Sequence, residues 1–353
     1  MGTDGAGATA AYDFDLPRDL IASRPLDRRD ASRLLALSRD SGGLTDRSFE
    51  DLPDMLASGD ALVINDSRVF PARLLGEKPT GARAEVLLIR PVDGFESENP
   101  RVWEAIVRPG GKLKPGRRVD VAPGFAVEIL ESAADGSRTV RLAGDGDPWD
   151  MIRRHGHVPL PPYIERPDDE KDRARYQTVY AEPTGSVAAP TAGLHFTRGL
   201  LDEIVRRGVR VVELTLHVGI GTFRPVEAER VEDHRVQPET YRFSERAARA
   251  LNDARAAGGR VWAVGTTSCR VLETVCDESG RYLPGSGATD LFLHPPYRFR
   301  GVDALLTNFH LPRSSLLMLV SAFAGTERTF EAYRHAVSER YRFYSYGDAM
   351  VIT

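Results

Sequence analysis

The pattern of apolar and polar positions changes twice along the chain of 353 residues. Between Leu74 and about Ala143 the apolar residues fall into short runs of strand character, separated by Gly, Pro or Asp. These runs cover residues 83–90, 101–107, 118–121, 125–130 and 139–142. Strands at this spacing, without helices between them, predict a small all-β barrel or sandwich over residues 73–145.

On either side of this segment, strands alternate with helices. Strands are predicted at residues 61–65, 209–217, 260–264, near 291, at 304–307 and at 349–352. Helices are predicted after the capping residues Asp147, Thr197 and Ser244, from about Ser268, and at residues 315–324 and 326–341. The predicted fold is α/β: a mixed-sheet α/β domain, residues 12–72 and 146–353, with an inserted small all-β barrel-like domain. Residues 1–11, rich in Gly and Ala, are expected to form a disordered tail.

The composition, 41% hydrophobic and 28% charged, is that of an ordinary globular protein and excludes a disordered one. The longest apolar run, residues 316–324, is too short to span a bilayer, and no apolar leader opens the chain. Cys269 and Cys276 give neither a disulfide framework nor a zinc pattern. His155 and His157 lack further ligands, so no metal site is expected. We therefore expect a cytoplasmic protein with reduced thiols.

The net charge of −4 excludes a global basic field of the kind that many nucleic-acid-binding proteins carry. One stretch is nevertheless basic and contains no acidic residue: Arg108, Lys112, Lys114, Arg117 and Arg118. Such a stretch is either a solvated loop or a local patch that binds the phosphates of RNA. Charge alone leaves both possibilities open.

In open α/β sheets, ligands bind where strands reach their carboxyl ends, and several predicted strands end in polar residues. After residues 61–65 come Asn65, Asp66 and Arg68, which suit a ribose hydroxyl or form a plain turn. His195 follows a run of small residues that includes Thr191 and Gly193, and it precedes a predicted helix. The positive end of that helix would lower the pKa of the imidazole and favour a neutral base, although a structural histidine is the alternative.

Three further polar stretches follow the predicted strands. The third stretch suits a turn around an adenosine or a phosphate and contains His217, Gly219, Gly221, Thr222, Phe223 and Arg224. The fourth suits an anion at a helix N-terminus, or is simply a well-capped helix, and contains Thr266, Thr267, Ser268 and Arg270. The fifth holds Asn308 and His310, and Tyr344 and Tyr346 near the end of the chain either stack on a base or cover the core. The stretch with Gly219 and Gly221 does not match a dinucleotide fingerprint, and the stretch with Thr266 and Thr267 does not match a Walker loop.

Taken together, these stretches resemble the S-adenosylmethionine:tRNA ribosyltransferase-isomerase family of the queuosine pathway. The resemblance runs from residue 12 to residue 350 and includes RDASRL (29–34), HVPLPPYI (157–164) and RYQTVY (175–180). It also covers residues 64–74, 188–196, 214–223 and 306–325. Departures are Ile220 in place of Ala, Cys269 in place of Val, and a longer segment at 277–287, where the shape of the loop is uncertain.

The resemblance implies that S-adenosylmethionine donates its ribosyl group to the aminomethyl group of a 7-deazaguanine at the wobble position of tRNA. The products are epoxyqueuosine in the tRNA, adenine and methionine. S-adenosylmethionine is consumed, so no cofactor is expected. The expected partner is a tRNA with a GUN anticodon, and the protein is expected to be a monomer without membrane contact.

This chemistry needs a base at the 5′ carbon of the ribose and an acid for the departing adenine. His195 and His217 are the candidates for these two roles, in either order, with His310 supporting them. Asp66 or Asp233 suits the acceptor amine, and Thr266, Thr267, Ser268 and Arg270 suit the methionine carboxylate. Two rivals are weaker. A methyltransferase needs a glycine-rich first loop that is missing, and an RNA-binding module built on residues 70–145 leaves the polar strand ends unexplained.

Overall fold

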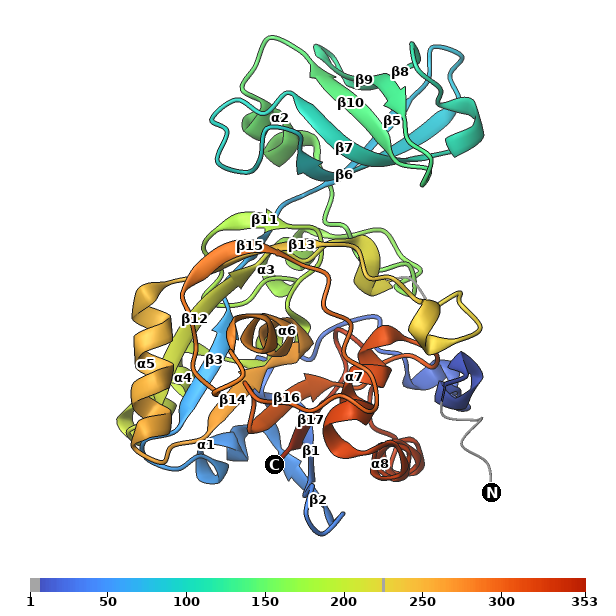
Figure 1. Cartoon of the computed structure of the whole chain (residues 1–353). Coiled ribbons are helices and arrows are strands. Elements are labelled where there is room, and N and C mark those ends of the chain that lie inside the picture. Colours follow the sequence, from blue (N-terminus) through green and yellow to red (C-terminus); the bar gives the residue numbers. More distant parts are fainter. Residues whose placement is uncertain (1–6, 224–225) are drawn as a thin grey trace.

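The computed structural model describes residues 7–223 and 226–353, which form a sheet domain and a separate barrel (Figure 1). The sheet domain is built on a mixed sheet of nine strands. In spatial order these are β15 (Gly285–Thr289), β13 (Glu239–Phe243), β12 (Arg210–Leu216), β3 (Ala61–Asn65), β14 (Val261–Val264), β16 (Ala304–Asn308), β17 (Ala349–Ile352), β1 (Arg33–Leu37) and β2 (Leu44–Ser48). Strands β12, β3, β14 and β16 are parallel, so their carboxyl ends meet at one edge of the sheet.

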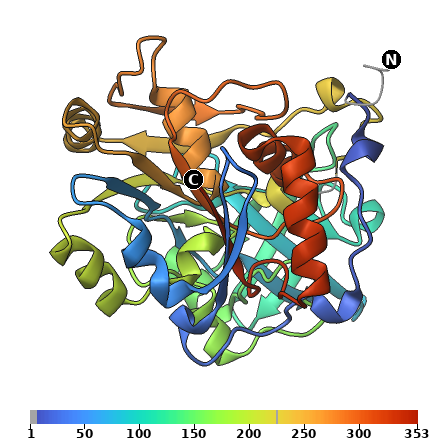
Figure 2. The ribbon, with the colours of Figure 1, turned by 90° about the horizontal axis from the view of Figure 1, so that it is seen from below.

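Helices cover both faces of this sheet (Figures 1 and 2). One face carries α5 (Glu245–Ala256), α6 (Gly265–Val275), α7 (Ser315–Ala324) and α8 (Thr326–Ser338), and the other carries α1 (Leu52–Met55) and α4 (Arg198–Arg206). Side chains alternate between the faces, so Val63 packs in one core while Leu62 and Ile64 pack in the other. Because both faces are buried, the central strands read as continuous apolar runs.

The inserted segment is a closed barrel of six antiparallel strands, which confirms the predicted all-β insert. Its strands are β5 (Arg73–Glu77), β6 (Arg83–Pro91), β7 (Val102–Arg108), β8 (Arg118–Ala122), β9 (Phe125–Ser132) and β10 (Arg138–Ala143). Its core contains the fully buried Trp103 and a layer of alternating aliphatic side chains. The barrel lies beyond the carboxyl edge of the parallel strands (Figure 1).

Shorter elements connect these parts: η1 (Thr9–Tyr12), η2 (Arg18–Leu20), η3 (Arg29–Ala31), η4 (Phe49–Asp51), β4 (Arg68–Val69), η5 (Gly110–Lys112), α2 (Pro148–His155), α3 (Glu170–Arg175), β11 (Thr184–Ser186), η6 (Thr191–His195), η7 (Ile220–Phe223) and η8 (Val231–Asp233). The predicted helix caps are confirmed at Asp147, Thr197 and Ser244, whose side chains each accept a hydrogen bond from a backbone amide of the first turn. No helix in the described ranges is long and apolar enough to cross a membrane.

Three predictions of local structure are wrong. The disordered tail expected over residues 1–11 is wrong for residues 7–11, because Thr9 is fully buried and donates its hydroxyl hydrogen to the carbonyl oxygen of Ala228 over 2.6 Å, while residues 1–6 lie outside the described residues. The strand expected near Leu291 is instead β15, at Gly285–Thr289. This edge strand pairs through its backbone with β13, which needs no apolar side chains. Helix α6 begins at Gly265 rather than near Ser268, so the polar stretch is its first turn.

The chain enters and leaves the barrel at adjacent points. Arg73 at the entry and His157 at the exit exchange two backbone hydrogen bonds, with N–O distances of 3.2 and 2.8 Å. Helix α2 ends at His155, just before the exit strand contact, and its C-cap Gly156 lies against the backbone of Pro71. A Cβ atom at residue 156 would lie 2.0 Å from the carbonyl oxygen of Pro71. The junction between the two domains therefore requires glycine at this position.

We predict that Gly156→Ala lowers the free energy of unfolding by about 1–3 kcal/mol, because the backbone of Pro71 must move to admit the methyl group. Urea denaturation measures the change. The control is Gly199→Ala, in the first turn of α4, where a Cβ atom has no neighbour within 4 Å and alanine favours the helix. Equal stability of Gly156→Ala and wild type would contradict the steric argument.

Candidate active site

Most of the polar stretches predicted from the sequence lie at the carboxyl edge of the parallel strands. The buried Asn65 at the end of β3 uses its whole amide within the protein. Its Nδ2 donates to the carbonyl oxygen of Leu216 over 3.0 Å, and its Oδ1 accepts from the amides of Ser67 and Leu216. Asn65 therefore joins the ends of β3 and β12, and it lines none of the three cavities described below.

The next residue, Asp66, accepts a hydrogen bond from Thr215 Oγ1 over 2.7 Å. Burial raises the pKa of Asp66 to about 6, and the negative charges of Glu213 and Glu182 add to the effect. Asp66 does not line any of the three cavities described below. The pKa of Asp66 is raised because the carboxyl group is buried and has two acidic neighbours, and not because it faces a cavity.

His195 is buried, and both of its ring nitrogens already have partners. Nδ1 lies 2.7 Å from Ser32 Oγ, and Nε2 lies 3.1 Å from Nδ2 of Asn308. Burial lowers the pKa of His195 to about 3, with smaller contributions from Arg342 and Arg29. The pKa is low, as the helix argument anticipated, but burial is the main cause. The geometry makes His195 a link between the start of β1 and the end of β16.

His310 lines a narrow cavity at the ends of β14 and β16, which we call the inner cavity. Its Nε2 lies 2.8 Å from Thr307 Oγ1, and burial lowers its pKa to about 3. The inner cavity also contains Thr191, Thr266, Thr267, Asn308, Tyr163 and Tyr344, together with apolar side chains of α7 and the segment before it. Thus four of the predicted polar stretches contribute to a single cavity.

Three polar atoms in the wall of the inner cavity are buried without a hydrogen-bond partner among the described residues. They are Thr267 Oγ1, Asn308 Oδ1 and the hydroxyl oxygen of Tyr344. The first turn of α6 supplies free backbone amides beside them, and Tyr344 has a strained backbone with φ of 76°. Buried polar atoms are costly to leave unpaired, so this arrangement suits a small polar ligand with both donors and acceptors.

Ser268 and Arg270 do not reach the inner cavity, although the sequence grouped them with Thr266 and Thr267. Ser268 is fully buried in α6. Arg270 lies one turn further along the helix and forms a buried ion pair with Glu239, whose second oxygen accepts a hydrogen bond from the amide of Gly219 over 2.8 Å. Arg270 follows Thr266 and Thr267 by four and three residues, so it lies about one helical turn further along the same side of α6.

His217 differs from the other two histidines because it lies where two larger cavities meet, between the sheet domain and the barrel. Its Nδ1 lies 2.7 Å from Ser67 Oγ, which lies 2.7 Å from Ser186 Oγ. Its Nε2 has no hydrogen-bond partner in the described ranges. Burial lowers the pKa of His217 to about 4, so the ring is neutral near pH 7. The ring contacts Phe95, from the β6–β7 loop of the barrel, at a centroid distance of 5.0 Å.

The first of these cavities, about 540 Å³ in volume, we call the glycine-loop cavity because Gly219 and Gly221 line it. The exposed Asp233 lies in its wall, as do His234 and the Arg270–Glu239 pair. The ion pair holds the loop after His217 through the amide of Gly219. No motif marked Glu239 or His234 in the sequence, because their partners are distant along the chain.

The second cavity, about 520 Å³ in volume, we call the aromatic cavity. Its walls include the rings of Phe70, Phe95, Trp149 and Tyr176 and the guanidinium groups of Arg68, Arg153 and Arg173. Phe95 and His217 line both this cavity and the glycine-loop cavity, so they stand between the two. Sequence reasoning missed Phe95 and Trp149, because it treated the barrel as a possible RNA-binding module and not as a wall of the site.

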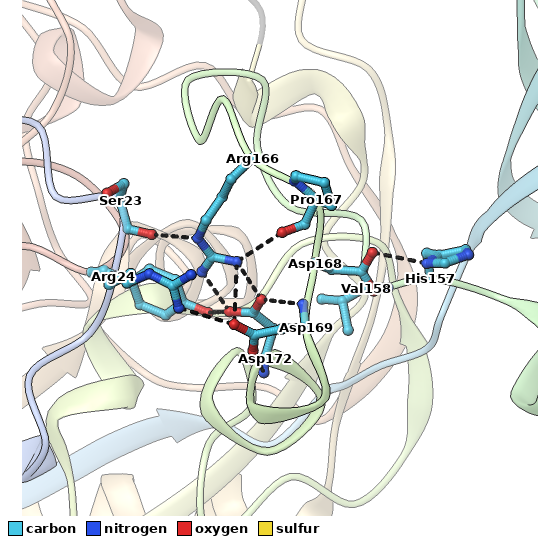
Figure 3. A network of polar contacts seen from close by, with 10 residues as sticks. Ser23, Arg24, His157, Val158, Arg166, Pro167, Asp168, Asp169 and Asp172 are labelled. Atoms are coloured by element: carbon cyan, nitrogen blue, oxygen red, sulfur yellow. Dashed lines mark hydrogen bonds and ion pairs between the residues drawn. The ribbon is translucent and has the colours of Figure 1, made fainter.

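A network of charged groups fixes the segment that forms one side of the aromatic cavity (Figure 3). Arg166 binds both oxygens of the buried Asp172, at 2.6 and 2.8 Å. Asp169 pairs with Arg24, and Asp168 accepts a hydrogen bond from the backbone amide of Val158 over 2.9 Å. These contacts neutralise Asp172 and hold helix α3, from which Arg173 reaches the cavity.

The remaining predicted residues lie apart from these cavities. Gly193 packs against Tyr180, and the hydroxyl of Tyr346 donates to Asp172 over 3.0 Å, so neither contacts a ligand site. The basic residues Arg108, Lys112, Lys114, Arg117 and Arg118 are all exposed on the barrel. Arg224 lies outside the described residues, and the side chains of Thr222 and Phe223 are not described. Within the described ranges, no group of three His, Cys, Asp or Glu side chains is placed to hold a metal ion.

Comparisons with known proteins agree over the whole chain. A family model described as queuosine biosynthesis protein matches residues 9–352. A Syntrophomonas wolfei protein named S-adenosylmethionine:tRNA ribosyltransferase-isomerase is 51% identical over 346 residues, which cover 97% of this chain and 96% of that protein. A protein of the same name from Trichlorobacter lovleyi is 47% identical over 341 residues, covering 97% and 98%.

Among solved structures, the S-adenosylmethionine tRNA ribosyltransferase from Thermotoga maritima matches with a TM-score of 0.55 and 37% identity. That match covers 97% of this chain and 100% of the other. The family model and the relatives each extend over far more than half of the sequence. The chain is therefore an enzyme of the S-adenosylmethionine:tRNA ribosyltransferase-isomerase family of queuosine biosynthesis.

Proposed function

We propose that this enzyme transfers and isomerises the ribosyl group of S-adenosylmethionine onto a 7-aminomethyl-7-deazaguanine at the wobble position of tRNA. Adenine and methionine leave, and epoxyqueuosine remains in the tRNA. The acceptor is a tRNA with a GUN anticodon, the donor is consumed, and no further cofactor takes part. The proposal rests above all on His217, a neutral histidine with a free nitrogen at the junction of two cavities.

His217 is the residue best suited to remove the proton from the 5′ carbon, which the neighbouring sulfonium makes acidic. When Nδ1 donates its hydrogen to Ser67 Oγ, Nε2 keeps a lone pair for this proton. His195 and His310 are more deeply buried; side chains occupy both ring nitrogens of His195, and Thr307 occupies Nε2 of His310. We assign them a positioning role for the ends of β1 and β16. Of the two carboxylates considered for the acceptor amine, Asp233 lines one of the three cavities, the glycine-loop cavity, and Asp66 lines none.

The donor fits across the inner cavity and the glycine-loop cavity, which share Val218 and Leu316 in their walls. The methionine carboxylate would bind the first turn of α6 with Thr267 and the Tyr344 hydroxyl as donors. The ammonium group would donate to Asn308 Oδ1. The sulfonium would lie near the rings of Tyr163 and Tyr344, whose centroids are 4.1 Å apart. The ribose would then lie toward His217.

The tRNA would reach the same cleft from the side of the barrel. The exposed basic stretch from Arg108 to Arg118 is a candidate for contacts with the phosphates of the anticodon stem. The enzyme would act as a monomer in the cytoplasm, where its substrate tRNA is found. The direct test mixes the enzyme with S-adenosylmethionine and tRNA bearing the aminomethyl base, followed by mass spectrometry of the digested nucleosides. A methylated base with S-adenosylhomocysteine, and no free adenine, would refute the proposal.

We predict that His217→Ala lowers kcat by about 10²–10⁴-fold, because the proton acceptor is lost. Release of adenine, measured by chromatography, reports the rate. Binding of tRNA and of S-adenosylmethionine should change little. The control is His335→Ala on α8, which removes a half-buried histidine that pairs with Asp46 far from the cleft. Turnover within a factor of two of wild type in His217→Ala would remove His217 from the mechanism.

The low pKa of His217 predicts an unusual pH profile. A base with its ordinary pKa near 6.5 loses activity below neutral pH, whereas kcat/KM should here stay level from pH 7.5 down to about 5.5 and fall as the pH approaches 4. The low pKa values also affect stability. Below about pH 6.5 the three histidines bind protons in the unfolded chain but not in the folded one, so the free energy of unfolding falls as the pH falls. Short assays after a pH jump separate the two effects. An inflection at pH 6.5 would contradict the assignment.

For the donor site we predict that Thr267→Val weakens binding of S-adenosylmethionine about 10- to 100-fold, because a hydrogen bond to a charged group contributes roughly 1.5–3 kcal/mol. Calorimetric titration measures the Kd. Thr274→Val is the matched control, since Thr274 lies near the other end of α6 and outside the cavities. Equal affinities of the two variants would show that the methionine group binds elsewhere.

A further inference from the structure

The proposed function places the donor in the other two cavities and leaves the aromatic cavity, which adjoins His217, without an occupant. Its lining combines two kinds of groups. Trp149 is half-buried and packs edge-to-face against Phe70 and Trp103, with centroid distances of 5.9 and 5.3 Å. The ring of Phe95 lies at the boundary with the glycine-loop cavity. Aromatic side chains that are packed from behind and accessible in front are the usual platforms for unstacked bases.

Of the three arginines of the aromatic cavity, Arg153 pairs with Asp150, whereas Arg68 and Arg173 are held in place without being neutralised. Arg68 donates to the carbonyl oxygens of Ala181 and Glu182, and Arg173 donates to those of Arg153 and Gly156. Neither Arg68 nor Arg173 has a carboxylate within ion-pair distance in the described ranges. Backbone carbonyls orient a guanidinium group but leave its charge available. Fixed, uncompensated cations beside aromatic rings suit a nucleotide, which carries a base and a phosphate.

Two carboxylates also line the aromatic cavity. Asp172 is neutralised by Arg166 and cannot repel a phosphate. Glu96 is exposed and has no ion-pair partner among the described residues, and it follows Phe95 directly. An anion at this position disfavours a phosphate but favours a cationic group. The aminomethyl group of the substrate base is such a cation, so Glu96 and the arginines suit opposite ends of the same nucleotide.

We propose that the aromatic cavity receives the tRNA nucleotide that is modified, extruded from the anticodon loop. Trp149 stacks on its base, and Arg68 and Arg173 bind the adjoining phosphates. The base would then approach His217 and the donor ribose from the side opposite the glycine-loop cavity. This inference rests on the proposed function, and it assigns the acceptor and the donor to different cavities.

The experiment compares Trp149→Ala, Trp149→Phe and Arg68→Gln with wild type in the full-length enzyme. Trp149→Ala should raise KM for tRNA on the order of tenfold and leave KM for S-adenosylmethionine unchanged, and Trp149→Phe should restore most of the loss. Arg68→Gln should lower the slope of log Kd for tRNA against log salt by about 0.7–1, while Arg68→Lys keeps the slope. If Trp149 had only a structural role, its replacement would not raise the KM for tRNA alone. If Arg68 had only a structural role, its replacement would not change the salt dependence of tRNA binding.

The controls are Phe330→Ala, a partly buried ring on α8, and Arg47→Gln, an exposed arginine on the outermost strand β2. Unchanged tRNA binding and KM in the Trp149 and Arg68 variants, with normal turnover, would overturn the inference. A rise in KM for S-adenosylmethionine instead would assign this cavity to the donor, and so would also overturn it. If the wild-type enzyme releases no adenine, the proposed function fails, but the tRNA-binding measurements still test the cavity.

Discussion

The hydrogen bonds of the buried Asn65 side chain are the interaction on which the site depends. Parallel strands that end in a buried edge leave backbone groups without ladder partners, and these groups must be paired. Asn65 pairs the amide and the carbonyl of Leu216 and the amide of Ser67 at once. It thereby fixes the residue before His217 and the residue that orients its ring. The cleft is thus anchored by a side chain that lines none of the three cavities.

A second constraint is the position of the barrel. The β6–β7 loop places Phe95 against His217, so the wall between the two large cavities is made from both domains. The junction that sets this position is tight, because Arg73 and His157 pair by their backbones and Gly156 has no room for a Cβ atom. A reaction that joins two substrates needs them at a shared boundary. Inserting a rigid barrel into the sheet domain is one way to build such a boundary.

Features that depend on neighbouring residues were predictable from the sequence. Continuous apolar runs identified the central strands, and capping residues at 147, 197 and 244 identified the starts of helices. The edge strand β15 was missed because its Gly-rich residues pair only through their backbone. The Arg270–Glu239 pair joins residues 31 positions apart, and no local pattern marks it. The residues that line the two larger cavities depend on how the two domains pack against each other. The periodicity of apolar residues along the chain carries no information on that packing.

The three histidines show why local sequence did not separate their roles. Each is held by hydroxyl or amide groups, and burial lowers the pKa of each well below its ordinary value. The difference lies in what occupies Nε2. Asn308, 113 residues away, occupies it in His195, and Thr307 occupies it in His310, whereas Nε2 of His217 has no partner in the described ranges. A low pKa makes an imidazole neutral at physiological pH, but neutrality alone does not make a base. A ring nitrogen without a partner in the described ranges, at the boundary between the two larger cavities, is what distinguishes His217.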